Sequence, residues 1–158
     1  MAIYRHPSAG QILICDFSSL STKSPEMTKK RPVIVLSPRM RRGNYCTVVP
    51  LSTTAPVPVQ AWNMRLRVNL PSPYTEPEVW VKGDMLYTIS FERLYPFKAG
   101  KDEFGKRIYK SFEISADEME QVWNCVFKGL GRFDVANHLD KQKKEDENKG
   151  DPALTIIV

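Results

Sequence analysis

The residues best suited to chemistry form a basic run, Lys29-Lys30-Arg31-Pro32, that leads directly into a stretch of apolar residues. A guanidinium is a rigid, permanently charged fork whose N–H groups match the oxygen atoms of a phosphate. At the start of a strand, Arg31 would be held more rigidly than a residue of the preceding loop. The run therefore predicts a phosphate contact at Arg31, although on spacing alone a solvated basic cluster is the slightly favoured interpretation.

Other familiar catalytic arrangements are missing from the sequence. Its two histidines, His6 and His138, lie near opposite ends of the expected domain, so a histidine acid–base pair is not expected. No Cys-x-x-Cys, His-Glu-x-x-His, phosphate-binding loop or dinucleotide-binding glycine motif occurs. The spacing of the carboxylates predicts no metal cluster, so we expect neither a metal site nor a cofactor.

The charge distribution favours an anionic partner. The net charge is +5, and residues 1–138 alone carry 19 Lys and Arg against 13 acidic residues, a net charge of +6. A basic domain suits a polyanion, of which nucleic acid is the commonest. A surface tuned only for solubility would give the same balance, and charge alone does not separate the two interpretations.

The sequence predicts a cytoplasmic protein. No stretch approaches the roughly 18 apolar residues of a membrane span, and the N-terminus carries no apolar run followed by a small-residue cleavage site. The three cysteines, Cys15, Cys46 and Cys125, are widely spaced and odd in number, which suits neither disulfides nor zinc. We expect each of them to be a small buried hydrophobe in a reducing compartment.

Short apolar runs between prolines and turn residues predict a mostly β domain. The clearest run is 63–70, where every second residue from Met64 to Leu70 is apolar, as in a half-buried strand. Further strands are expected at 11–17, 31–38, 45–51, 79–82, 85–90 and 107–114. Residues 18–30 and 95–106 are expected to be a flexible loop and a turn-rich connection.

One amphipathic helix is predicted near the end of this domain. Ser115 followed by Glu118 forms a capping box, and apolar residues then recur at helical spacing until Gly129. We expect the apolar face to pack on the sheet. Trp123 and Phe127 are expected to be core residues rather than a platform for a ligand.

The chain divides, by composition, into one domain and a tail. Residues 1–138 are expected to form the domain, and residues 139–158 a charged linker with a short apolar end. The apolar residues 154–158 could add as a strand to this sheet or to that of a partner, while a frayed end is slightly favoured.

Three groups of residues, in order along the chain, resemble the MazF/PemK/Kid toxins of type II toxin–antitoxin systems. The first group comprises Gly10-Gln11-Ile12, Asp16-Phe17, the loop with Glu26, and Arg31-Pro32-Val33-Ile34-Val35-Leu36-Ser37-Pro38. The second is Val48-Val49-Pro50-Leu51-Ser52-Thr53, and the third is Lys82-Gly83-Asp84-Met85-Leu86-Tyr87-Thr88-Ile89. The final helix also fits, so the resemblance covers about Gly10 to Leu130.

The resemblance implies a mostly β (α+β) fold, a small SH3-like barrel of the CcdB/MazF type with a C-terminal α-helix, that forms a homodimer. It also implies a sequence-selective, metal-independent endoribonuclease that cleaves single-stranded RNA and is neutralised by a cognate antitoxin. In that reaction the 2′-hydroxyl attacks the adjacent phosphorus and leaves a cyclic phosphate and a 5′-hydroxyl end. Such chemistry needs a base, a cation for the phosphoryl charge and an acid for the leaving group.

The matching positions imply a role for each residue of a catalytic set. Arg31 matches the catalytic arginine, and Ser52, with Thr53 as the alternative one position on, falls where the family usually has a catalytic threonine. Asp84 matches an aspartate that acts as base or substrate contact in some members. Glu26 matches a loop glutamate that would orient Arg31 or act as the base.

RNA contacts are expected from seven basic residues, namely Lys30, Lys82, Arg39, Arg41, Arg42, Arg65 and Arg67, with Tyr45, Trp62 or Tyr74 for stacking. For any one of these aromatic residues a core or interface role is the favoured interpretation. The sequence departs from the family at Lys82, which replaces an arginine, at Ser52 and at Met85, which replaces a glutamine.

These departures keep alternatives open. One is a non-enzymatic binding module on the same barrel, either a protein poison like the gyrase inhibitors or an RNA-binding relic, because a fold does not fix a function. Another is a purely structural phage or plasmid protein, which only the unusual tail favours.

Overall fold

The computed structural model describes residues 2–38 and 43–149. Three predicted RNA contacts, Arg39, Arg41 and Arg42, and the apolar segment 154–158 lie outside the described residues.

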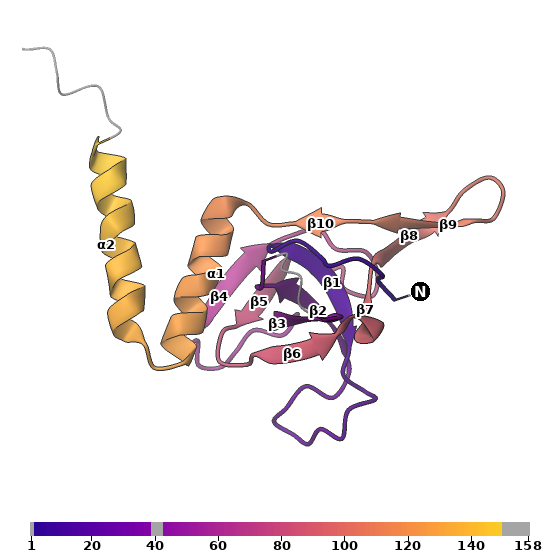
Figure 1. Cartoon of the computed structure of the whole chain (residues 1–158), viewed down its shortest axis with the longest axis horizontal. Helices are drawn as coiled ribbons and strands as arrows, with labels where there is room; N and C mark the ends of the chain where they lie inside the picture. The colour runs from indigo at the N-terminus through magenta and orange to yellow at the C-terminus, as the bar shows by residue number, and fades with distance from the viewer. Residues whose placement is uncertain (1, 39–42, 150–158) are drawn as a thin grey trace, which may run out of the picture.

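A strongly curled antiparallel sheet forms the body of the protein (Figure 1). Its main path runs β10-β1-β2-β3-β5-β4, while β6 pairs with β3 and β7 pairs with β1. The strands are β1 (Gln11–Asp16), β2 (Lys30–Val35), β3 (Tyr45–Ser52), β4 (Asn63–Arg67), β5 (Glu78–Lys82), β6 (Tyr87–Ser90), β7 (Leu94–Tyr95) and β10 (Phe112–Glu113). A 3-10 turn, η1 (Phe91–Arg93), joins β6 to β7. A mostly β domain with a C-terminal helix was predicted, and this architecture confirms it.

Two apolar cores lie on opposite faces of the sheet. Because side chains alternate along a strand, Ile12 of β1 enters one core while Leu13 and Cys15 enter the other. The first core is completed by Val122 and Val126 of the helix α1 (Ala116–Gly129). The second core is closed by residues of the loop after β1 and of the β6–η1–β7 segment, namely Phe17, Met27, Ile89, Phe91 and Leu94.

The helix α1 begins as predicted. The Ser115 hydroxyl accepts a hydrogen bond from the backbone N–H of Glu118 (3.2 Å), and the Glu118 carboxylate accepts one from the N–H of Ser115 (2.7 Å). This reciprocal arrangement satisfies two of the N–H groups that a helix start leaves without a partner.

The three cysteines are buried and free, as predicted. Burial raises the pKa of Cys15 to about 12 and that of Cys46 to about 11, and it also raises the pKa of Cys125. The thiols are therefore protonated near neutral pH.

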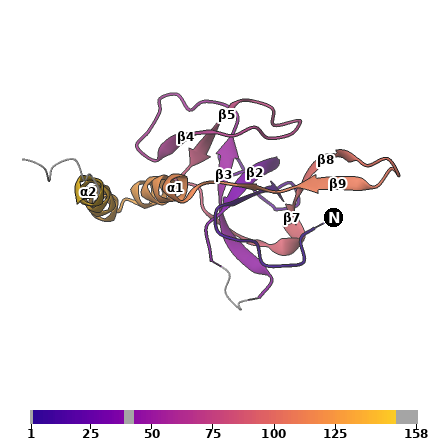
Figure 2. The same ribbon diagram turned by 90° about the horizontal axis from the view of Figure 1, so that it is seen from above.

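Two elements were missed by the sequence analysis. The segment expected to be a turn-rich connection contains strand β8 (Phe97–Lys101), which forms a two-stranded hairpin with β9 (Arg107–Lys110), a strand that lies inside the predicted strand 107–114. A second helix, α2 (Phe133–Lys149), occupies most of the segment predicted to be a linker, so the expected boundary at residue 139 falls inside a helix. Seen from above, α2 lies beyond α1 on one side of the sheet and the hairpin projects on the other (Figure 2).

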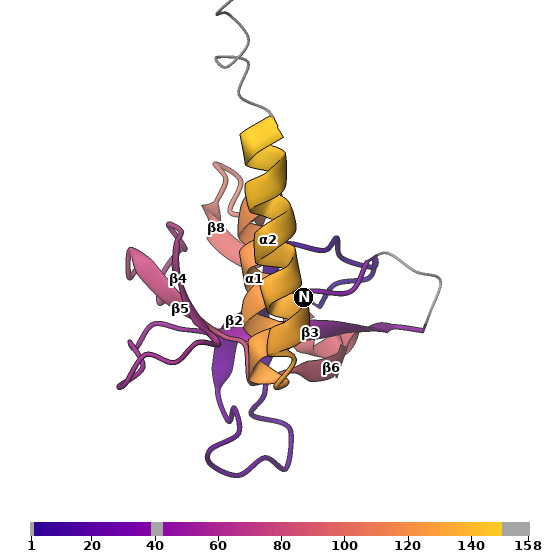
Figure 3. The same cartoon turned by 90° about the vertical axis from the view of Figure 1, so that its left-hand side faces the viewer.

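The charged composition of α2 explains why it was mistaken for a linker. High charge favours solvation, but Lys, Gln and Glu are also good helix formers. The buried residue Ala136 anchors α2 against α1, and Asn124 of α1 donates a hydrogen bond to Asp140 of α2. Figure 3, with the helices facing the viewer, shows α2 lying along α1. Neither helix of the described residues combines the length and the apolar character that crossing a membrane would require.

Candidate functional site

Arg31 belongs to a row of residues that crosses five strands on one face of the sheet. Arg31 pairs with Cys15 across β1–β2, and Trp80 pairs with Ser52 on one side and Arg65 on the other. Continuing the β2–β3 register from the Val33–Pro50 pair places Arg31 opposite Ser52. Because paired residues point to the same face, the sheet gathers these side chains about 4.8 Å apart per strand.

This face changes character at Arg31. On one side of the row, this face is covered by the second core, which includes Leu13, Val33 and Val48. From Arg31 on β2 to Ser52 on β3 and Trp80 on β5, the row itself carries polar and aromatic side chains. Arg31 is half-buried, and its Nε atom is buried without a hydrogen-bond partner among the described residues. A buried donor left unpaired is uncommon and costs free energy, so this guanidinium is suited to receive an acceptor from a ligand.

The opposite face of the same strand carries a supporting cluster around Lys30. The Lys30 ammonium lies 3.4 Å from the Asp16 carboxylate and 5.8 Å from the centre of the Tyr95 ring. The Tyr74 hydroxyl donates a hydrogen bond to the Lys30 carbonyl oxygen (3.1 Å). Lys30, predicted to contact RNA, is therefore engaged by neighbours that fix the start of β2.

Electrostatics couple this cluster to Arg31. The pKa of Asp16 is lowered, chiefly because the Ser18 hydroxyl donates to its carboxylate and further because Lys30 is adjacent. Burial raises the pKa of Tyr74, while the positive charge of Arg31 opposes that rise. Tyr74 therefore stays a neutral hydroxyl close to the guanidinium.

Ser52 is the last residue of β3, and Thr53 lies in the bend that follows. Ser52 is buried, and its hydroxyl both donates to the Thr54 carbonyl oxygen and accepts from the Thr54 N–H, each at 3.2 Å. To donate to a phosphate, the Ser52 hydroxyl must exchange its bond to the Thr54 carbonyl. Thr53, the next residue along the chain, is half-buried.

The Glu26 carboxylate is engaged within its own loop and not by Arg31. It is exposed in the loop between β1 and β2, and its carboxylate accepts a hydrogen bond from the Lys23 N–H (2.7 Å). In the structure this carboxylate organises its own loop, and within the described residues it makes no ion pair with Arg31.

Lys82 and Asp84 occupy the end of β5 and the turn after it. Lys82 follows Trp80 by two residues and therefore shares its face, opposite Asn63 of β4. Asp84 is exposed, and the turn before it packs tightly on α1: a Cβ placed on Gly83 would lie 2.6 Å from the Cys125 carbonyl oxygen. The position of Asp84 is thus set by backbone packing.

Two predicted RNA contacts already have an acidic partner. Arg65 and Arg67 of β4 lie 3.5 Å and 3.3 Å from the Glu78 carboxylate on β5. Glu78 and Trp80 were not predicted as site residues, although the alternation in Glu78-Val-Trp-Val-Lys82 places Glu78, Trp80 and Lys82 on one face. Of the aromatic residues considered for stacking, Tyr45 is exposed, whereas Trp62 and Tyr74 are half-buried.

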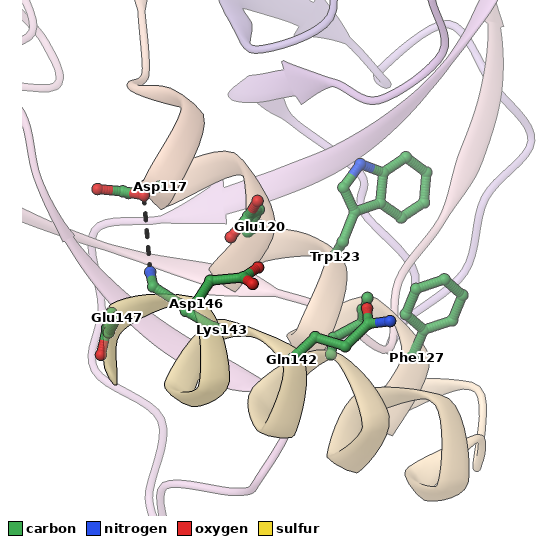
Figure 4. A pocket seen from close by; sticks show the side chains of 9 residues that line it. Asp117, Glu120, Trp123, Phe127, Gln142, Lys143, Asp146 and Glu147 are labelled. Atoms are coloured by element: carbon green, nitrogen blue, oxygen red, sulfur yellow. Dashed lines mark ion pairs between the residues drawn. The ribbon is translucent and has the colours of Figure 1, made fainter. Parts of the chain in front are cut away.

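A separate groove of about 800 Å³ lies between α1 and α2 and contains none of the predicted site residues (Figure 4). Trp123 and Phe127, stacked with ring centres 5.8 Å apart, line it together with acidic residues and Lys143. Trp123 is half-buried and packs against the first core, as predicted, whereas Phe127, also half-buried, belongs to neither core and lines the groove, contrary to its predicted core role. Among the described residues, no group of three or more His, Cys, Asp or Glu side chains is placed to hold a metal ion.

Comparison with known families decides which family the chain belongs to. Residues 8–128, which include the cross-strand row and all of α1 except Gly129, match the sequence model of the PemK-like, MazF-like toxins of type II toxin–antitoxin systems. The chain belongs to the PemK/MazF toxin family.

Relatives of this PemK/MazF-family protein agree in sequence and in fold. The Escherichia coli (strain K12) protein YifN is 31% identical over 113 residues, 60% of this chain and 75% of YifN. The MazF crystal structure from Deinococcus radiodurans matches with a TM-score of 0.54 at 20% identity, over 82% of this chain and 99% of that one. A mycobacterial endoribonuclease in complex with its cognate antitoxin matches with a TM-score of 0.51 at 20% identity, over 80% and 96% of the two chains. The structural matches confirm the predicted MazF-like fold.

Proposed function

We propose that this PemK/MazF-family protein is an endoribonuclease toxin that cleaves single-stranded RNA at selected sequences without a metal ion. The observation that carries the proposal is the half-buried guanidinium of Arg31, whose Nε has no hydrogen-bond partner in the described part of the chain, at the polar end of a face lined by Ser52, Trp80, Arg65 and Lys82. Membership of the PemK/MazF toxin family and the fold shared with a mycobacterial endoribonuclease support the same activity.

The proposed reaction is an internal displacement at phosphorus. The 2′-oxygen forms a bond to phosphorus while the bond from phosphorus to the 5′-oxygen breaks, giving a 2′,3′-cyclic phosphate and a 5′-hydroxyl. One proton leaves the 2′-hydroxyl and one is delivered to the departing 5′-oxygen. Arg31 stabilises the negative charge that builds on the non-bridging oxygens, and its fork can contact two of them at once.

The remaining predicted catalytic residues take supporting roles in this proposal. Ser52 donates its hydroxyl to the phosphate after releasing the Thr54 carbonyl, and Thr53 is the alternative donor. Glu26 and Asp84, both exposed, are the candidates for the base.

The face beyond the row is suited to guide RNA. Lys82 contributes a positive charge, and Trp80 offers a half-buried ring between Ser52 and Arg65. Single-stranded RNA is recognised largely by stacking of splayed bases and by cationic contacts to its backbone. Selectivity for a short motif would arise from this face.

Homodimerisation, neutralisation by a cognate antitoxin and a cytoplasmic location are part of the same proposal. The mycobacterial relative was solved with its cognate antitoxin, which supports the expectation of such a partner for a chain of this fold.

The test is cleavage of a long single-stranded RNA in EDTA, with new ends mapped by primer extension. Wild type is compared with Arg31→Ala and with Arg132→Ala, a matched arginine whose ion pair with Asp134 lies at the start of α2. Discrete cuts by wild type and Arg132→Ala, but not by Arg31→Ala, support the proposal. A folded wild-type protein that makes no cuts contradicts it.

One observation favours a second candidate function, a non-enzymatic binding module. The Ser52 hydroxyl and the Glu26 carboxylate are both engaged by backbone groups of their own segments. If these contacts persist when RNA is bound, the row binds phosphate without a poised base. Stoichiometric RNA binding without product formation would identify this case, and recovery of a topoisomerase without RNA would identify a protein poison.

A further inference from the structure

The β8–β9 hairpin is an ordered arm that projects from the body on the side away from the helices (Figures 1 and 2). Its tip is fixed by Asp102, whose carboxylate accepts hydrogen bonds from the N–H groups of Phe104 (3.0 Å) and Lys106 (2.8 Å). A two-stranded hairpin buries little apolar surface and is marginally stable alone. Beyond the buried Phe97, most side chains of the arm are exposed, including Phe104 and Tyr109.

One face of the arm combines cations with an aromatic ring. From Phe97 to Lys110 the sequence carries five cations and two carboxylates, a net charge of +3. The register pairs Lys98 with Tyr109 and Lys101 with Arg107, so these four side chains share one face. All four are exposed. We call this set the arm face.

A small cavity adjoins the arm face at Tyr109. It has a volume of about 380 Å³ and is lined by Tyr109 together with Tyr4, Arg5 and Gln11. Tyr4 is 78% exposed, so its ring is free to pack on an incoming planar group. Two tyrosine rings with an arginine and an amide nearby are the groups that bind a splayed nucleobase and its phosphate.

The root of the arm lies beside the candidate site. Phe97, the first residue of β8, packs edge-to-face on Tyr74 with ring centres 6.3 Å apart. The Tyr74 hydroxyl in turn donates to the carbonyl of Lys30, the residue before Arg31. Two side-chain contacts therefore connect the arm to the strand start that carries the guanidinium.

We propose that the arm face holds the single-stranded RNA that flanks the scissile phosphate, with one base in the cavity between Tyr4 and Tyr109. The proposal rests on the proposed function for the identity of the cut strand. Lys98, Lys101 and Arg107 contact successive phosphates and Tyr109 stacks on a base. The net positive charge disfavours a second copy of the arm as the occupant and favours a polyanion.

The test measures binding of a fluorescein-labelled, mixed-sequence single-stranded RNA by anisotropy, in the full chain carrying Arg31→Ala so that no cleavage occurs. The arm variant is Lys98→Ser/Lys101→Ser/Arg107→Ser. The matched control removes the same charge from the helices, as Lys128→Ser/Lys141→Ser/Lys144→Ser. Circular dichroism verifies that both variants are folded.

The arm variant is expected to reduce the slope of log affinity against log salt by roughly 2, since a single strand contributes about 0.7 per phosphate contact. Tyr109→Ala is expected to weaken binding roughly tenfold, the size of one lost base stack. The helix control should leave the slope near that of the parent. Equal binding by the arm variant and the helix control overturns the proposal.

Two further readouts separate this proposal from the others. The first readout is RNA cleavage by proteins that keep Arg31. If the wild type cuts RNA and the arm variant cuts it with the same KM, the proposed function is supported and the arm proposal is overturned. If the wild type cuts no RNA and the arm variant binds RNA more weakly than its parent, the proposed function is overturned and the arm proposal is supported. Loss of self-association by the arm variant in sedimentation, with RNA binding unchanged, identifies a protein interface and overturns the arm proposal.

Discussion

Gly129 of α1 lies against Gly83 so closely that a Cβ on Gly129 would sit 2.5 Å from the Gly83 carbonyl oxygen. The colliding atoms belong to backbone and cannot rotate away. This contact joins the end of α1 to the turn that carries Asp84.

Gly129→Ala is therefore expected to destabilise the protein. Alanine would gain up to about 1 kcal/mol of helix propensity, but overpacking against rigid atoms costs about 1–3 kcal/mol. A lower denaturation midpoint in urea would show that the collision outweighs the propensity. Gly105→Ala offers a contrast, because φ there is +77° and no described atom lies within 4 Å of the new Cβ, so it measures the cost of backbone strain without a collision.

Arg31→Lys separates charge from geometry in the proposed reaction. Removing a preorganised donor from a developing anion typically lowers kcat by about 10²–10³, and we expect Arg31→Ala to lose at least that much. Lysine keeps the charge but not the fork, so its activity should fall between wild type and Arg31→Ala. Rates measured with saturating RNA check this order, and equal rates for Arg31→Lys and Arg31→Ala would show that charge alone contributes nothing.

Asp16→Asn should lower stability in a pH-dependent manner. The pKa of Asp16 is lowered in the folded protein, so its ionised form stabilises the fold above the ordinary aspartate pKa, and that contribution disappears as the pH falls through the lowered value. At neutral pH we expect a loss of about 1 kcal/mol or less, since the Lys30 partner is largely exposed. Urea unfolding at neutral and acidic pH would reveal a difference from wild type that shrinks on acidification; a constant difference would contradict the assignment.

Glu78→Gln tests whether the β4–β5 face contacts RNA. The carboxylate now neutralises part of the charge of Arg65 and Arg67, and its removal leaves both guanidinium groups free for phosphates. We expect RNA affinity in the Arg31→Ala background to rise a few-fold, with a steeper salt dependence. Glu120→Gln, on the exposed side of α1, removes the same charge elsewhere and should have little effect.

Much of the fold could be predicted because it depends on local patterns. Alternation marked the strands, and the capping box marked the start of α1. Strand β8 escaped prediction because it is exposed beyond Phe97 and lacks apolar alternation, while α2 escaped because its charge resembled that of a solvated tail.

The site was predicted less completely for a different reason. Arg31 was identified by its motif, but its neighbours depend on the strand register, which long-range pairing sets and sequence spacing does not encode. Trp80 and Glu78 come from a strand that is far away in the sequence. The hydrogen bond from Lys23 to Glu26 depends likewise on the path of a loop.

The three buried thiols can serve as built-in probes of local unfolding. Only a thiolate reacts readily with an alkylating reagent, and Cys15, Cys46 and Cys125 are covered and held protonated. Labelling must therefore wait for local unfolding, and each rate measures how often one region exposes its sulfur. Cys125 reports on detachment of α1 from the Gly83 turn, whereas Cys15 and Cys46 report on the second core, so mass spectrometry of a single unmodified sample can rank the two regions by stability.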